Sequence, residues 1–214
     1  GAAGSVGSNV TLNAPSIRVD SGAGGINGIN LNGGDNSFGI GGNGGTLNIG
    51  TVGTPIPNDV IINQPVNATT GSNLLATGGD GGTVSVSSNG TVAVNSTIKV
   101  SESAAPRASN KGGNINVTSN KVSGTAISVS SSGQLLALLN GLAPGPGGSI
   151  KLTSAGGNVN VHGTVKADRG TVEVTNNAPT GFVNLSNATL HGAPDQAGPH
   201  GPNGPLAGRG RRVP

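Results

Sequence analysis

The chain has 214 residues, of which 41 are glycine and 13 are proline, and it contains no Cys, Met, Trp or Tyr. Its 11 basic and 8 acidic residues leave a formal charge of +3, which excludes both a highly charged disordered chain and a nucleic-acid footprint. The missing thiols exclude disulfides and thiolate chemistry, and no apolar run approaches the ~20 residues of a membrane span. With only two aromatic residues, a wide globular core would lack its usual large fillers, so narrow aliphatic stacks are expected.

Residues 1–45 form a Gly/Asn-rich segment, in which we expect the early coils of a repeat. From residue 44 onward one phrase recurs, Gly-Gly followed by alternating polar and aliphatic residues. Its copies begin at Gly44, Gly81, Gly112, Gly147 and Gly156. Further period-2 segments lie at 91–94, 97–100, 126–129, 164–167, 171–174 and 182–185. The alternation predicts short strands, and the recurring phrase predicts a repeat architecture.

Three such strands occupy the 22 positions from Gly148 to Gly170. We therefore predict an all-β fold, a parallel β-helix or solenoid with three short strands per coil of about 20 residues. Aliphatic residues point inward, and Asn side chains at the corners allow amide ladders between coils. The corner pairs Asn89-Gly90, His162-Gly163 and Arg169-Gly170 are expected to supply positive φ angles. An antiparallel β-sandwich remains the alternative.

The solenoid body is predicted to span residues 46–190, with two excursions. The first covers residues 53–80 around the run 60–62, because Pro55, Pro57 and Pro65 cannot donate to a ladder. The second covers residues 130–146, where the helix formers of 134–141 predict one or two helical turns. The apolar side of this helix, formed by Leu135, Leu138 and Leu139, either covers its own core or contacts a neighbouring molecule.

Residues 191–214 form a Gly/Pro-rich tail, for which we predict an extended chain. It contains three Gly-Pro-X triplets before the register breaks, and we expect these to lie along a neighbouring subunit. The assembly residues of the tail are Gly198, Pro199, Gly201, Pro202, Gly204, Pro205 and Leu206. Because the first residue is Gly1 rather than Met, we expect a processed or excised segment.

Candidate chemical sites are weak. The G-x-G-x-x-G match at 39–44 has no helix pattern after it, and the single Asp80 does not make a calcium roll. Lys166, Asp168 and Glu173 are expected to pair on the solvated surface. The three histidines show no triad spacing. We therefore expect no catalytic residues, no cofactor and no metal ion.

The stretch 147–190 resembles the β-helical repeats of filamentous-haemagglutinin-like bacterial exoproteins, and residues 81–130 resemble a looser version. The resemblance implies a right-handed β-helix that is secreted, bacterial and structural, an adhesin or surface fibre. The Gly/Asn-rich start and the Gly/Pro-rich tail depart from that pattern.

A solenoid has two open ends, and no polar cap is evident in this sequence. Either the chain is part of a longer rod, or copies stack into a filament, or the termini cover the ends. We favour an extracellular fibre subunit whose partner is the chain itself, without nucleic-acid binding or membrane insertion. The alternative is an adhesin that binds cell-surface glycans or other cells. A β-helix polysaccharide lyase and an ice-binding solenoid rank below both.

Overall fold

The computed structural model describes residues 4–21, 28–36, 38–71, 78–100, 111–139, 146–178 and 181–192. Its regular structure over these ranges consists of strands, and none of them contains a helix. The strands are β1 (Asn9–Leu12), β2 (Ile17–Val19), β3 (Ile29–Asn30), β4 (Thr46–Ile49), β5 (Val60–Ile62), β6 (Val66–Asn67), β7 (Thr83–Ser88), β8 (Val92–Val94), β9 (Thr97–Lys99), β10 (Asn114–Ser119), β11 (Thr125–Val129), β12 (Gln134–Leu136), β13 (Ser149–Ser154), β14 (Asn158–Val161), β15 (Thr164–Lys166), β16 (Thr171–Asn176), β17 (Val183–Asn184) and β18 (Thr189–His191).

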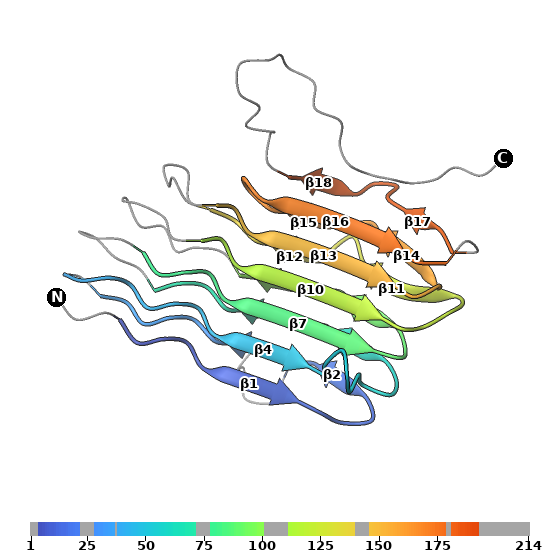
Figure 1. Cartoon of the computed structure of the whole chain (residues 1–214), viewed down its shortest axis with the longest axis horizontal. Coiled ribbons are helices and arrows are strands. Elements are labelled where there is room, and N and C mark those ends of the chain that lie inside the picture. Colours follow the sequence, from blue (N-terminus) through green and yellow to red (C-terminus); the bar gives the residue numbers. More distant parts are fainter. Residues whose placement is uncertain are drawn as a thin grey trace, which may run out of the picture.

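The strands form three parallel six-stranded sheets, and each sheet takes every third strand (Figure 1). Sheet A runs from β1 to β16, sheet B from β2 to β17, and sheet C from β3 to β18. The chain visits the three sheets in turn and returns one strand further along. The described residues thus make six stacked coils, from coil 1 (β1–β3) to coil 6 (β16–β18). The predicted parallel solenoid with three strands per coil is confirmed.

Successive coils keep one register although their lengths differ. Ser149 of coil 5 pairs with Thr171 of coil 6, a step of 22 residues that agrees with the predicted coil of about 20. By contrast, Asn9 pairs with Thr46 and Thr46 pairs with Thr83, so each of these steps takes 37 residues. The extra residues lie between strands, because the strands themselves stay aligned from coil to coil.

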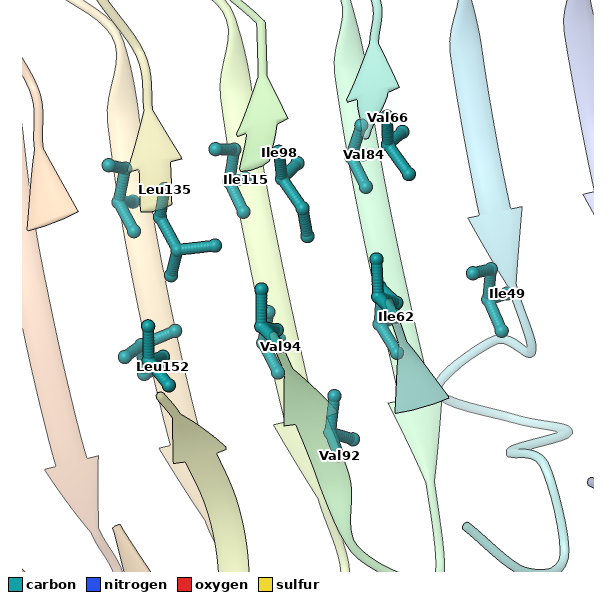
Figure 2. Close-up of a cluster of buried hydrophobic side chains, with 14 of the residues drawn as sticks. Ile49, Ile62, Val66, Val84, Val92, Val94, Ile98, Ile115, Leu135 and Leu152 are labelled. Atoms are coloured by element: carbon teal, nitrogen blue, oxygen red, sulfur yellow. The ribbon is translucent and has the colours of Figure 1, made fainter. Parts of the chain in front are cut away.

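The core is a narrow stack of aliphatic side chains inside the coils (Figure 2). Each inward position of one coil lies next to the same position of the next, and each fully buried side chain contributes about 1.5–3 kcal/mol. One such row in sheet A consists of Leu47, Val84, Ile115 and Ile150. Both phenylalanines, Phe38 and Phe182, are exposed, so this core is aliphatic as expected.

The helix predicted at 134–141 is wrong. Gln134–Leu136 is strand β12, which pairs with β9 on one side and β15 on the other. Leu135, Ala137 and Leu139 alternate inward and are buried, so the run is used with period 2 rather than with the period of a helix. Burial in the stack and two ladders of backbone hydrogen bonds outweigh the helix propensity of leucine. Residues 140 and 141 lie outside the described residues.

The excursion predicted at 53–80 is also wrong for its central part. Val60–Ile62 is strand β5, which pairs with β2 and β8, and β6 follows it. The three prolines do not interrupt the ladders because they stand between strands, and the carbonyl oxygen of Pro65 accepts a hydrogen bond from the Ile29 N–H at 2.8 Å. The loop that the structure has here is shorter than the predicted excursion and lies between β4 and β5. In this loop Ile56 is buried and forms an isolated parallel β-bridge with Ser88.

A buried serine closes the corner between sheets A and B in successive coils. Ser88, Ser119 and Ser154 are fully buried there at equivalent register positions. The hydroxyl of Ser119 donates to the Gly90 carbonyl oxygen at 2.7 Å and accepts from the Lys121 N–H at 3.2 Å. Each hydroxyl therefore satisfies backbone groups that the turn would otherwise leave unpaired.

We expect Ser119→Ala to lower the free energy of unfolding by about 1–3 kcal/mol, because it removes the hydroxyl that pairs with two partly buried backbone groups. Ser87→Ala is the matched control, since the buried Ser87 hydroxyl oxygen has no hydrogen-bond partner among the described residues. This control should be neutral or slightly stabilising. Urea unfolding of both variants measures the difference, and equal losses would contradict the assigned role of the corner serine.

Asparagine and aspartate side chains link neighbouring coils in two ways. Asn95 Nδ2 donates to Asn63 Oδ1 at 2.9 Å, and Asn63 Nδ2 donates to Asp20 Oδ1 at 2.6 Å. The predicted side-chain ladder is therefore confirmed at the corner between sheets B and C. Elsewhere the side-chain oxygen accepts from a backbone N–H of the next coil, as Asn9 does from Thr46 at 3.2 Å. The same arrangement joins Asn32 to Thr69, Asn43 to Asp80, Asp59 to Thr91, Asp80 to Lys111 and Asn158 to Phe182.

Candidate functional site

Three ion pairs lie on the surface of the described residues, and each is at least partly exposed. Lys166 pairs with Asp168 at 3.2 Å, as predicted, but Glu173 pairs with Lys151 at 3.2 Å. The expected three-residue cluster is therefore divided. The reason is the register, because Glu173 of β16 lies directly beside Lys151 of β13 on the outer face of sheet A. Exposed pairs of this kind contribute little to stability.

The other sequence candidates have structural roles. Asp80 Oδ1 accepts the Lys111 N–H at 3.1 Å, which links two coils. The segment 39–44 leads into strand β4 rather than a helix. His162 Nδ1 lies 2.9 Å from the Ser186 carbonyl oxygen at a corner. The part of the chain that the structure describes contains no group of three or more His, Asp or Glu residues that could hold a metal ion.

The predicted assembly residues divide into two sets. Leu135 and Leu139 face the interior and are buried, so they do not form a contact surface for a neighbour. Leu138 is half-buried, and its part in assembly stays a prediction. Leu135 and Leu139 are core residues because β12 and the residues after it belong to the body of the solenoid. Gly198, Pro199, Gly201, Pro202, Gly204, Pro205 and Leu206 lie outside the described residues, and their part in assembly stays a prediction.

The two end coils are the main candidate surfaces. Most of their inward aliphatic side chains are only partly buried, whereas the residues at the same register positions in coils 2–5 are buried. Coil 1 presents Val10, Leu12, Ile17 and Ile29, and coil 6 presents Val172, Val174, Val183 and Leu190. Within the described residues, β1 and β16 each pair with a strand on one side only. Each end therefore combines a strip of apolar side chains with a strand edge that has unpaired backbone groups.

Coil 1 also carries an ion pair at the corner between sheets B and C. Asp20 accepts hydrogen bonds from Asn63 Nδ2 at 2.6 Å and from Arg18 Nε at 2.5 Å. The bond from Asn63, and after it the bond from Arg18, holds the pKa of Asp20 below its ordinary value of 3.8. A lowered pKa means that the ionised carboxylate stabilises the fold above pH 3.8. This contribution is lost as the pH falls through the pKa of the folded state.

We therefore expect the Tm of the chain to fall more steeply between pH 5 and pH 2 than that of Asp20→Asn, which has no carboxyl group at this position. The effect is small because the group is exposed. Thermal unfolding followed by circular dichroism at several pH values measures it. Parallel Tm curves for the two proteins would show that Asp20 contributes nothing to the acid sensitivity.

Glycine-rich segments extend the corner between sheets C and A in the first coils (Figure 1). The Gly34 N–H donates to the Ser5 carbonyl oxygen at 2.7 Å, the Gly42 N–H to that of Gly34 at 3.0 Å, and the Gly71 N–H to that of Gly42 at 2.8 Å. These bonds alternate between segments that leave sheet C and segments that enter sheet A. The backbone close to these glycines is held by such main-chain bonds. Gly41, Gly42 and Gly44 of the segment 39–44 belong to this packing.

The Gly-Gly phrase stands where neighbouring coils approach each other closely. A Cβ on the first glycine would lie 2.2–2.6 Å from the amide nitrogen of the next coil's second position, at Gly7, Gly44, Gly81, Gly112 and Gly147. A Cβ on the second glycine would lie 1.7–2.4 Å from the carbonyl oxygen of the same position in the preceding coil, at Gly45, Gly82, Gly113, Gly148 and Gly170. The phrase is therefore required by coil packing on both sides.

Positive φ angles explain few of the corner glycines. Gly90 and Gly163 were expected to need them, but neither has a positive φ. A Cβ on Gly163 would lie 2.1 Å from the Gly133 carbonyl oxygen, so close approach of the coils is the reason for glycine there. The expectation is confirmed for Arg169, whose φ is 53°.

The sequence predicted the uncapped ends but not the reason for the Gly-Gly phrase, although the fixed recurrence of the phrase was the available signal.

No described helix is long and apolar enough to cross a membrane. No family model, curated protein or solved structure matches the chain.

Proposed function

We propose that this chain is a structural module of an extracellular fibre, in which copies associate end to end through coils 1 and 6. The observation that carries the proposal is the pair of ends of the described solenoid, each with half-buried aliphatic side chains and a strand edge that no other described strand pairs with. The resemblance of residues 147–190 to secreted β-helical repeats supports the extracellular setting.

The two ends match each other in register. If coil 6 of one copy lies under coil 1 of the next, β16 continues sheet A onto β1. Val172 then lies beside Val10, and Val174 beside Leu12, because these residues belong to the same inward rows. Sheet B continues in the same way from Val183 to Ile17. Burial of these apolar groups is the driving force that the proposal requires.

The charges at the two ends are compatible with this arrangement. On the outer faces, Glu173 would lie beside Thr11 and Asn184 beside Arg18. Neither pair places like charges opposite each other, which would oppose association.

Electron microscopy of the purified chain tests the proposal. Six coils at a strand spacing of about 4.8 Å predict a subunit repeat of at least about 29 Å along the fibre. Fibre diffraction should show the strand spacing along the same axis. Dispersed monomers at every concentration would contradict the proposal, and would favour the alternative that further coils of a longer polypeptide cover the ends.

A further inference from the structure

The Gly-Gly phrase is incomplete in the first and last coils. Coil 1 has Gly7-Ser8, with serine at the second position, and coil 6 has Arg169-Gly170, with arginine at the first. In both coils the residue that departs from glycine is the one that faces away from the stack. The glycine that faces a neighbouring coil is kept in each case.

The geometry of the other coils shows what these side chains would meet. Ser8 holds the position of Gly45 and Gly82, where a Cβ would lie 2.1 Å and 2.3 Å from the carbonyl oxygen of the preceding coil. Real Cβ atoms do not approach backbone atoms within 3.0 Å. A second copy stacked below coil 1 at the spacing of the other coils would therefore collide with the Ser8 Cβ.

Arg169 is the residue that departs from glycine at the other end. It holds the position of Gly112 and Gly147, where a Cβ would lie 2.2 Å from the amide nitrogen of the next coil. Its backbone is also left-handed, with a φ of 53°, whereas neither glycine has a positive φ. The corner of coil 6 therefore differs from the corners of the coils below it in side chain and in backbone.

We propose that Ser8 and Arg169 are steric blocks that prevent a second copy from docking at full coil contact along the corner between sheets C and A. The inference rests on the proposed function for the identity of the partner, a second copy of this chain. Association is then confined to the strand edges of the end coils, and it is weaker than the contact between coils within one copy.

The test compares the wild-type chain with the double variant Ser8→Gly, Arg169→Gly. The double variant restores the complete phrase at both ends, so it should assemble at a concentration about tenfold lower than the wild type. The matched control is Ser8→Ala, Arg169→Ala, which loses the same hydroxyl and guanidinium groups but keeps both Cβ atoms. It should assemble like the wild type. Light scattering and sedimentation measure the critical concentration of each protein.

The outcomes separate this inference from the proposed function. If the wild type stays monomeric and the glycine variant assembles, the steric blocks are supported and the proposed fibre function fails. If both assemble and the glycine variant does so at the lower concentration, both proposals are supported. A glycine variant whose assembly equals that of the alanine control would overturn the inference, whether or not the wild type forms fibres.

Discussion

Gly113→Ala is expected to lower the free energy of unfolding by about 3 kcal/mol, the upper part of the range for overpacked sites. The new methyl group would lie 2.3 Å from the Val100 carbonyl oxygen and 2.4 Å from the Gly82 carbonyl oxygen. Both contacts are with backbone in the middle of the stack, so neither can be relieved by a side-chain rotation. Relief requires coils 3 and 4 to separate, which weakens the ladder of hydrogen bonds between them.

The control for this substitution is Gly53→Ala. A Cβ at Gly53 has no heavy atom within 4 Å and the backbone has no positive φ, so the variant should be within about 0.5 kcal/mol of the wild type. Urea unfolding of the two variants isolates the effect of close coil approach from the general effect of replacing glycine. Similar stabilities for both would show that the coils can separate at little cost.

Val174→Lys is expected to abolish end-to-end assembly while leaving the single solenoid folded. Val174 is half-buried at the open edge of coil 6, where the long side chain can bend so that its ammonium group reaches water. In a stack, the same group would be enclosed against Leu12 of the next copy. Inward-pointing charges on an edge strand are a known means of preventing edge association.

Thr171→Lys provides the matched control, because it adds the same charge on the same strand at an exposed, outward-facing position. Fibres should form from the control and not from Val174→Lys, as seen by electron microscopy. Circular dichroism checks that both variants remain folded. Fibres formed equally well by both would exclude coil 6 as an assembly surface.

The period-2 segments and the Gly-Gly phrase were sufficient to predict the three-stranded coil, because alternation is a local property. The helix prediction for the leucine-rich residues 134–139 was wrong because their composition favours a helix. Only pairing with the neighbouring strands β9 and β15 makes this segment a strand. The excursion predicted from the prolines was wrong for a related reason. Pro65 excludes a strand at its own position but not at residues 60–62 and 66–67 on either side.

The candidate surfaces depend on relations between coils, which a single pass along the sequence does not reveal. Nothing in the local sequence distinguishes Ser8 and Arg169. Only the strand register, which aligns them with Gly45 and Gly147, shows that each replaces a glycine of the Gly-Gly phrase. The open ends were predicted from the lack of a cap, but the matching rows of Val172 with Val10 required the pairings.

The steps of 22 and 37 residues between paired positions have a practical consequence. Because the ladders hold their register while the connecting corners change in length, a corner should accept foreign peptide without misaligning the strands on either side. The loop between β4 and β5 is the natural insertion point, since Val52 and Gly53 are exposed there. The solenoid would then serve as a rigid scaffold that displays one grafted epitope per copy.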